Sequence, residues 1–295
     1  MAIKPGEAAI GFIGIGVMGA SMAEHIREAG YELHVYTRTA AKADELVRKG
    51  AVWHETPAGL AAACDAVITM VGYPADVEQI YLGHEGLVAH TKAGAYLIDM
   101  TTSSPLLAKR IHEAAAVKGL HALDAPVSGG DVGARERRLS IMVGGSAEDF
   151  AAALPLLELM GTNIVHQGAA GAGQHTKMCN QIAIATNMLG VCEALAYAEA
   201  AGLDPAVVLR SIESGAAGSW SLSNLGPRII AGNFEPGFYV KHFIKDMGIA
   251  LESAKEMGLD TPGLRLAESL YRQLAEKGYA EKGTQALFKL WEKPV

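Results

Sequence analysis

Residues 8–19 read AAIGFIGIGVMG, and this stretch decides the fold of the chain. It begins with an apolar run typical of a buried β-strand, continues into the pattern G-x-G-x-x-G, and leads into an amphipathic helical stretch. Glycines in this pattern permit a tight turn, let the backbone approach a pyrophosphate, and allow close helix packing. The helix amino terminus adds positive potential for an anion. A purely structural turn is the alternative. The stretch predicts a dinucleotide site formed by Gly14, Gly16, Val17, Met18 and Gly19.

The same alternation of strand and helix continues to about residue 170. Further β-rich runs are ELHVYT, DAVITMV, AYLIDM, HALDAP, LSIMVGG and NIVHQ, with helical stretches between most of them. This rhythm predicts βαβ units and therefore an α/β, Rossmann-like, doubly wound parallel sheet over residues 1–170. The strand signal stops after Gly173.

A second domain, all-helical, is predicted for residues 171–295. A helical pattern about 28 residues long covers residues 174–201, ends at Gly202, and would join the two domains as a long interdomain helix. Further helices are predicted near residues 204–214, 243–257, 262–277 and 284–291.

The composition favours a protein that acts on small molecules. Net charge is −7, with acidic and basic residues scattered along 295 residues, which excludes the one-sided basic face of a nucleic-acid binder. No secretory signal opens the sequence, and the longest apolar run is interrupted by polar residues. The ten histidines and three cysteines show no metal-ligand spacing. We therefore expect a soluble cytoplasmic protein with no metal, membrane or nucleic-acid partner.

The end of the second predicted strand carries Thr37, Arg38 and Thr39, about 20 residues beyond the glycines. An NAD enzyme places an acid here, on the ribose 2′-hydroxyl, and this chain has none. A guanidinium with two hydroxyls suits a 2′-phosphate instead. The pattern therefore favours NADP, with NAD possible; a helix cap followed by a solvated arginine is the alternative.

Three further stretches carry side chains suited to chemistry. They are DAPVSGG at residues 124–130, GAGQHTKMCNQ at 171–181, and FYVKHFIKD at 238–246. A serine hydroxyl and two glycine amides can hold a carboxylate, although such a sequence is often only a turn. Lys177 stands near the start of the long predicted helix.

Together with GFIGIGVMG and IDMTTSSP at residues 98–105, these stretches resemble the β-hydroxyacid dehydrogenase family over nearly the whole chain. The resemblance implies that Lys177 is the general acid/base, that Ser128, Gly129 and Gly130 hold the substrate carboxylate, and that Thr102 lies beside the nicotinamide ribose. It also implies that Phe238, Lys245 and Asp246 close the site from the helical domain, Phe238 toward the substrate and the other two toward the cofactor. A homodimer or homotetramer is implied as well.

The chemistry explains a lysine at residue 177 independently. Hydride transfer to an aldehyde carbon creates an alkoxide that needs a proton, and a partly desolvated ammonium can deliver it. A lysine that snorkels from a helix end is the alternative. Asn180 and Gln181 follow three and four residues later on the same helix face. Relatives usually have Asn where this chain has Gln181, so which of the two contacts the substrate stays open.

Three other features received a structural interpretation. The run Arg135, Glu136, Arg137 and Arg138 reads as a solvated hairpin, with contact to an anionic substrate as the alternative. His175 is expected to pack or cap, and Trp220 to wall the substrate pocket or to lie in the core.

The sequence thus predicts an NAD(P)-dependent oxidoreductase that interconverts a small β-hydroxyacid and its semialdehyde, a small carboxylate-bearing aldehyde. Alternatives are a non-catalytic cofactor-binding scaffold and an imine- or phosphogluconate-type reductase relative. Phosphogluconate-type relatives have His where this chain has Asn180. Imine-reducing relatives generally replace the lysine that stands here at residue 177, so Lys177 argues against them.

Overall fold

A computed structural model describes residues 3–292 of the chain. The chain divides into two compact units, Met1–Lys177 and Met178–Val295. All strands lie in the first unit, and every later element that the structure describes is a helix, apart from a single bridge between Tyr239 and Gly283. The predicted fold class, a Rossmann-like sheet followed by helices, is therefore confirmed.

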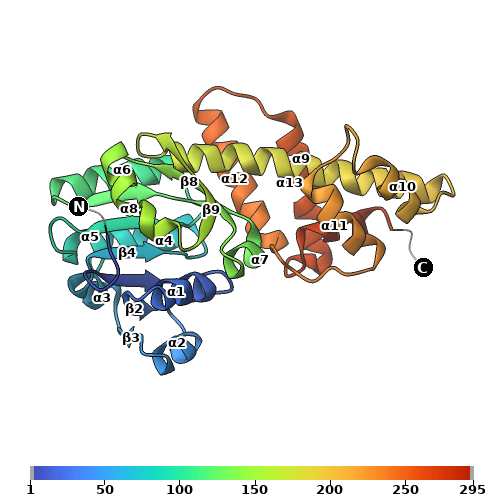
Figure 1. Ribbon diagram of the computed structural model, residues 1–295. Coiled ribbons are helices and arrows are strands. Elements are labelled where there is room, and N and C mark those ends of the chain that lie inside the picture. The colour runs from blue at the N-terminus through green and yellow to red at the C-terminus, as the bar shows by residue number, and fades with distance from the viewer. Residues whose placement is uncertain (1–2, 293–295) are drawn as a thin grey trace. The chain divides into compact units, whose positions relative to one another are not determined.

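The first unit contains a nine-stranded sheet in the order β3-β2-β1-β4-β5-β6-β8-β7, with β9 paired to β8 (Figure 1). The strands are β1 Ala9–Ile13, β2 Glu32–Tyr36, β3 Val52–Trp53, β4 Ala66–Thr69, β5 Tyr96–Asp99, β6 His121–Asp124, β7 Val127–Ser128, β8 Leu139–Gly144 and β9 Gly161–Gly168. Strands β1 to β6 are parallel in the order expected for a doubly wound sheet. Strand β8, the predicted LSIMVGG run, is antiparallel to β6 and β7, and this reversal departs from the predicted parallel direction.

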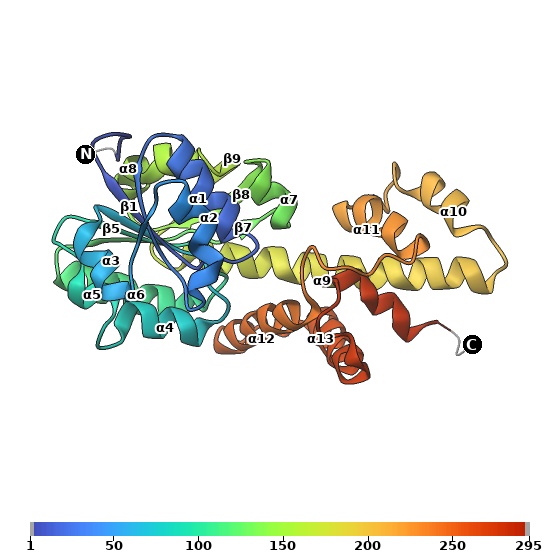
Figure 2. The same cartoon turned by 90° about the horizontal axis from the view of Figure 1, so that it is seen from below.

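Helices cover both faces of this sheet (Figure 2). They are α1 Gly19–Glu28, η1 Ala40–Ala43, α2 Asp44–Arg48, α3 Pro57–Ala63, α4 Pro74–Leu82, α5 Leu87–His90, α6 Pro105–Val117, α7 Gly130–Arg135 and α8 Ala147–Leu157. Met22 of α1 and Leu156 of α8 belong to one buried cluster, whereas Leu60 of α3 and Ile111 of α6 belong to another. Strand β4, buried along its whole length, is apolar except for Thr69 because both of its faces are covered.

The parallel strands bring their carboxyl ends to one edge of the sheet. The chain order reverses between β1 and β4, and ligands of such sheets bind in the crevice outside the carboxyl ends at that point. The segments after β1, β4, β5 and β6 all start at this edge.

Helix α9, Ala172–Ala200, confirms the long predicted helix, and the division between the two units falls within it, after Lys177. The domain boundary expected after residue 170 remains a prediction. No helix among residues 3–292 is both long enough and apolar enough to cross a membrane.

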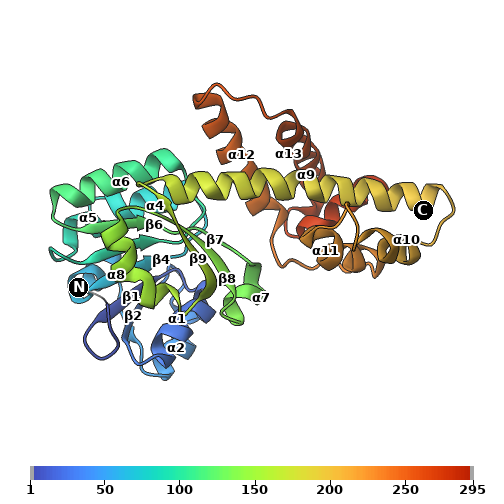
Figure 3. The same cartoon turned by 45° about the horizontal axis from the view of Figure 1, so that its top comes forward.

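The second unit packs helices around the part of α9 after residue 178 (Figure 3). They are α10 Pro205–Ile212, α11 Trp220–Ile230, α12 Val240–Glu256, α13 Pro262–Leu274, the π-helical turn η2 Ala275–Tyr279 and the 3₁₀ helix η3 Thr284–Leu290. Leu195, Leu225, Phe243 and Tyr271 are part of its core.

Helix α11 lies where the sequence predicted no helix. Its amino terminus is capped by the Ser219 hydroxyl, which accepts a hydrogen bond from the Leu222 amide at 3.1 Å. Gly226 and Pro227, residues typical of loops, lie inside it and concealed it. The first residue of α11, Trp220, is 66% exposed, so the alternative that placed it in the core is wrong.

Candidate active site

The glycine turn after β1 is closed against the protein at two positions and open at a third. Gly14 has φ +102°, and a Cβ there would lie 2.1 Å from the Met70 carbonyl oxygen. A Cβ on Gly19 would lie 2.0 Å from the Gly14 carbonyl oxygen. A Cβ on Gly16 would meet no protein atom within 4 Å. Glycine is therefore required for the fold at residues 14 and 19, whereas at Gly16 the backbone faces open space.

The amino terminus of α1 has no protein group that caps it with a side chain. Met18 occupies the capping position without a side-chain hydrogen bond, and the first turn contains no acidic residue. Val17 beside it is 65% exposed. An uncapped helix start next to an open glycine backbone fits the pyrophosphate of a dinucleotide.

The end of β2 presents Arg38 to solvent, with its side chain 80% exposed. Its Nη1 donates to Asp76 Oδ1 at 3.2 Å, and Asp76 Oδ2 accepts from the Tyr73 amide at 3.2 Å. The sequence pattern missed this acid because Asp76 belongs to α4 and not to β2. An exposed pair of this kind contributes only about 0 to 1 kcal/mol, so the guanidinium is held weakly.

The turn after β7 requires its two glycines. Gly129 has φ +131° and Gly130 has φ +64°, both in the region that side-chain-bearing residues rarely adopt. Half-buried Ser128 ends β7 opposite Ser140 of β8. The geometry fixes where the Ser128 hydroxyl and the following amides lie.

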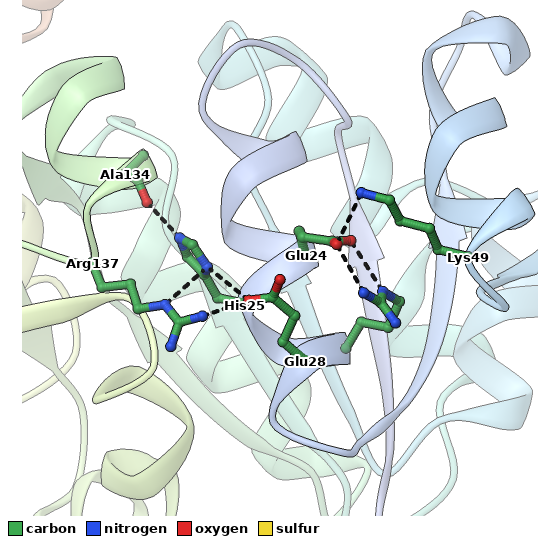
Figure 4. A network of polar contacts seen from close by, with 7 residues as sticks. Glu24, His25, Glu28, Lys49, Ala134 and Arg137 are labelled. Carbon is green, nitrogen blue, oxygen red and sulfur yellow. Dashed lines mark hydrogen bonds and ion pairs between the residues drawn. The ribbon is translucent and has the colours of Figure 1, made fainter.

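The run at residues 135–138 is exposed, as predicted, but it is not a hairpin, which corrects that part of the prediction. It is the end of α7 and the turn into β8, with Arg137 at φ +57°. Arg137 Nε donates to His25 Nδ1 at 3.0 Å, its Nη2 donates to Glu28 at 2.5 Å, and His25 Nε2 lies 2.9 Å from the Ala134 carbonyl oxygen (Figure 4). Arg137 therefore joins the helix after the SGG turn to α1, and Arg138 pairs with Glu136 at the surface.

The start of α9 is packed tightly against the strand ends. Gly171 has φ +87°, and a Cβ on Gly173 would lie 2.4 Å from the Met142 carbonyl oxygen and 2.5 Å from the Asp124 carbonyl oxygen. A Cβ on Gly144 would lie 2.5 Å from Asp124 Oδ1. The glycines of GAG in the sequence let the helix begin in direct contact with β6 and β8.

Asp124, the last residue of β6, caps this helix start. Its Oδ1 accepts from the Gly171 amide at 2.7 Å, and its Oδ2 accepts from the Gln174 amide at 2.8 Å. Burial raises the pKa of the Asp124 carboxyl to about 6, although these amide hydrogen bonds act in the opposite direction. The sequence showed Asp124 beside a glycine turn but not the helix that it caps.

Gln174 connects α9 to the segment after β5. Its Nε2 donates to the Thr101 carbonyl at 2.7 Å, and its Oε1 accepts from the Ser103 amide at 2.9 Å. Thr102 lies between those two contacts in the chain and is half-buried. Lys177 follows Gln174 by one turn of α9 and is only 6% exposed.

A buried row of polar residues crosses the ends of three neighbouring strands. Thr69, Asp99 and Asp124 are register partners on β4, β5 and β6. Asp99 Oδ1 accepts from the Thr69 hydroxyl at 2.8 Å and from the Thr101 amide at 3.0 Å. Burial raises the pKa of the Asp99 carboxyl to about 6, and the charge of Asp124 acts in the same direction.

The second unit holds the remaining predicted residues. Asn180 Nδ2 donates to Gln181 Oε1 at 2.7 Å, and Gln181 Nε2 donates to Asp246 Oδ2 at 2.5 Å. Lys245 Nζ lies 2.8 Å from Asp246 Oδ1 in a pair whose side chains are 13% and 3% exposed. Gln181 is fully buried, and both ends of its amide contact other side chains of this unit.

Phe238, also in the second unit, is partly buried and packs against the core with its ring tilted relative to that of Phe243. Its ring centroid lies 5.5 Å from that of Phe243 at an angle of 56°. Among the residues that the structure describes, no group of three or more His, Cys, Asp or Glu side chains could hold a metal ion.

A doubly wound sheet with an open glycine turn defines the first unit as a dinucleotide-binding domain. Known proteins give the same result. Residues 9–168 match the NAD binding domain of 6-phosphogluconate dehydrogenase, and residues 171–291 match the family described as NAD-binding of NADP-dependent 3-hydroxyisobutyrate dehydrogenase. The chain belongs to the NAD(P)-dependent β-hydroxyacid dehydrogenase family that contains the 3-hydroxyisobutyrate dehydrogenases.

Individual relatives cover almost the whole chain. An uncharacterized oxidoreductase of Bacillus subtilis is 62% identical over 96% of this chain and 99% of its own length. The 2-hydroxy-3-oxopropionate reductase of Escherichia coli is 40% identical over 96% of this chain and 97% of its own length. A solved structure of 3-hydroxyisobutyrate dehydrogenase with L-serine, from Mycobacterium tuberculosis, is 29% identical and covers 97% of this chain and 99% of its own, with a TM-score of 0.90.

Proposed function

We propose that this protein reduces a small carboxylate-bearing aldehyde to a β-hydroxyacid, and catalyses the reverse oxidation, with Lys177 as general acid/base and NADP as the preferred cofactor. One observation carries the proposal. Lys177 is buried and lies one turn after the start of α9, and Asp124 fixes that start to the same edge of the sheet as the open glycine turn. The names of two relatives, 2-hydroxy-3-oxopropionate reductase and 3-hydroxyisobutyrate dehydrogenase, support the substrate class.

The residues of the first unit fit a dinucleotide phosphate. Gly14, Gly16, Val17, Met18 and Gly19 would hold the pyrophosphate at the uncapped start of α1. Thr37, Arg38 and Thr39 would hold a 2′-phosphate, and Thr102 would lie beside the nicotinamide ribose. The description of the second matched family as NADP-dependent supports this preference. When bound, the nicotinamide supplies the hydride for reduction or accepts it in oxidation.

The protein's own task is to move one proton. Reduction adds a hydride to the carbonyl carbon and a proton to the carbonyl oxygen, so negative charge builds on that oxygen as the reaction proceeds. The Lys177 ammonium donates the proton as general acid, and in oxidation its neutral amine accepts the hydroxyl proton. A non-catalytic scaffold has no need of a buried lysine at this position.

Asn180 is the better candidate for the substrate oxygen of the two amides that follow Lys177. It lies three residues after the lysine, on the same side of α9, and is half-buried. The Gln181 amide is engaged with Asn180 and Asp246, so we assign Gln181 the task of orienting Asn180. We expect Phe238 to complete the substrate site and the pair Lys245 and Asp246 to complete the cofactor site.

Ser128, Gly129 and Gly130 are assigned to the substrate carboxylate. Positive φ at both glycines commits this turn to one backbone path, which supports a built anion site over a flexible loop.

The direct test is NADPH oxidation against a panel of small semialdehydes, each paired with an aldehyde of the same length that lacks the carboxylate. We expect turnover with at least one semialdehyde and much weaker turnover with its partner. Absence of turnover with every aldehyde, in protein that binds NADPH, favours the non-catalytic scaffold.

Ser128→Ala sharpens the substrate assignment. Loss of one hydrogen bond to a charged group costs about 1.5 to 3 kcal/mol, so KM for the semialdehyde should rise by about ten- to a hundredfold. Cofactor affinity should not change. Ser140→Ala, opposite it on β8, is the matched control. An equal loss for the aldehyde without a carboxylate contradicts the assignment.

A further inference from the structure

We propose that Gln174 and Asp124 are positioning residues that fix the ammonium of Lys177 relative to the segment around Thr102. The inference rests on the proposed function of Lys177 and names the side chains that give it a defined place. Neither residue needs to touch the substrate or the cofactor for this role.

The first step is the fixed origin of α9. Asp124 is 5% exposed and receives the amides of Gly171 and Gln174, one on each carboxylate oxygen. A Cβ on Gly173 would clash with backbone oxygens of β6 and β8, so α9 begins in direct contact with both strands. Asp124 at the end of β6 therefore sets how far along α9 Lys177 lies from the ends of the strands.

The second step is the rotation of α9. Gln174 is fully buried, and its amide donates to Thr101 and accepts from Ser103, residues more than 70 positions earlier in the chain. Gln174 and Lys177 are three residues apart and share one side of the helix. A side chain that needs both a donor and an acceptor holds that side of α9 toward the segment around Thr102.

The third step connects this contact to the strand beside the glycine turn. Thr101 Oγ1 accepts from the Val71 amide at 3.0 Å, and the Thr101 amide donates to Asp99. Thr69 donates to Asp99 and contacts the Tyr81 hydroxyl at 2.9 Å. The segments after β4, β5 and β6 and the first turn of α9 thus form one buried hydrogen-bonded network.

An ordinary helix cap explains less of this arrangement. A cap needs only an acceptor for the first amides, which Asp124 supplies. The two side-chain bonds of Gln174 satisfy no group of α9 itself and reach a different segment. They serve the relative placement of the two segments.

The experiment compares Gln174→Met, which keeps the length and removes both bonds, with Gln174→Glu, which keeps only the acceptor. Gln273→Met, at an exposed position of α13, is the matched control. Misplacement of a catalytic group by about 1 Å can lower the rate by about a hundredfold. We expect kcat to fall by about ten- to a hundredfold in Gln174→Met and less in Gln174→Glu, with KM and NADPH affinity within about twofold. The solvent deuterium isotope effect on kcat should increase.

A second readout needs no turnover. Reaction of the Lys177 amine with an excess of an amine-labelling reagent, followed by peptide mass spectrometry, should be several-fold faster in Gln174→Met and in Asp124→Asn. The rate at exposed Lys118 should not change. Folding is checked by thermal unfolding, and Gln174→Glu carries the test if Gln174→Met does not fold.

The outcomes separate the two proposals. If the wild type reduces no aldehyde, the proposed function fails, and the labelling rate alone decides the inference. Unchanged labelling of Lys177 overturns the inference, as does a kcat within twofold of wild type in both Gln174 variants. Reduced kcat with accelerated labelling supports it.

Discussion

Two helix starts lie in the first unit next to the same pattern of a glycine, one other residue and a second glycine, yet they differ in what surrounds them. The pattern is residues 14–16 just before α1 and residues 171–173 at the start of α9. At the start of α1, which we call the open start, Gly16 faces open space and no side chain caps the helix. At the start of α9, which we call the closed start, Gly173 lies against two carbonyl oxygens and Asp124 caps the amides.

The two helix starts differ in the source of the negative charge that their amide groups meet. The amide groups of an uncapped helix start remain available for an anion from outside the protein, whereas Asp124 already occupies those of α9. The same local pattern therefore leaves the start of α1 open to an anion, which we propose is a cofactor phosphate, and fixes the start of α9, which carries Lys177. We interpret α1 as the binding helix and α9 as the catalytic helix on this basis.

Substitution of Gly16 and of Gly173, the second glycine of each pattern, should show the difference between the two helix starts most strongly. Gly173→Ala places a methyl group 2.4 Å from a backbone oxygen, and overpacking of this kind costs up to about 3 kcal/mol, which chemical denaturation will measure. Gly16→Ala should leave the free energy of unfolding unchanged and lower NADPH affinity. Gly190→Ala, at an exposed and open helical position, is the control. Equal stability of the two variants contradicts the assigned difference.

The buried carboxylates of Asp99 and Asp124, at the ends of β5 and β6, predict a pH dependence of stability. Because burial raises the pKa of folded Asp99 to about 6 from its usual 3.8, the unfolded chain releases this proton first as pH rises. Stability should therefore fall between about pH 4 and pH 6, by roughly 3 kcal/mol for this group.

Asp99→Asn isolates that contribution, since the amide oxygen can still accept from Thr69 and Thr101. Denaturant unfolding at pH 4 and pH 7 should show the variant gaining on the wild type at the higher pH. A wild-type advantage that grows from pH 4 to pH 7 is the opposite sign and rejects the interpretation.

A smaller effect is expected at Arg38, just after the end of β2. Arg38→Ala should lower NADPH affinity by about tenfold, because a hydrogen bond to a charged group contributes about 1.5 kcal/mol or more. NADH affinity should change little. Equal binding of both cofactors by the wild type contradicts the preference, and Asp76→Asn shows whether the acid beside Arg38 affects it.

The sequence was sufficient for the fold and for the open start because both depend on local patterns. Alternating strands and helices predicted the doubly wound sheet, and G-x-G-x-x-G predicted the turn. The strand at β8 was predicted but its antiparallel direction was not, because strand direction has no local signal. Helix α11 was missed, because Gly226 and Pro227 are residues typical of a loop.

The closed start could not be predicted because its partners are distant in the chain. Nothing near Gln174 indicates that its amide bonds to Thr101 and Ser103, and nothing near Asp124 indicates that it caps α9. Asp76 beside Arg38 and His25 beside Arg137 are further contacts between separate elements. Long-range polar pairs of this kind need the folded chain to be seen.

The most direct test of the division of labour between the two helix starts is one paired measurement of NADPH affinity and semialdehyde turnover in Lys177→Met and Gly16→Ala. We predict that Lys177→Met binds NADPH like the wild type and loses about 10² to 10⁴ in kcat, because it lacks the proton, and that Gly16→Ala loses affinity instead. Lys177→Arg should not restore the rate, since a guanidinium keeps its proton. Near-wild-type turnover in Lys177→Met, or unchanged NADPH affinity in Gly16→Ala, would contradict the account.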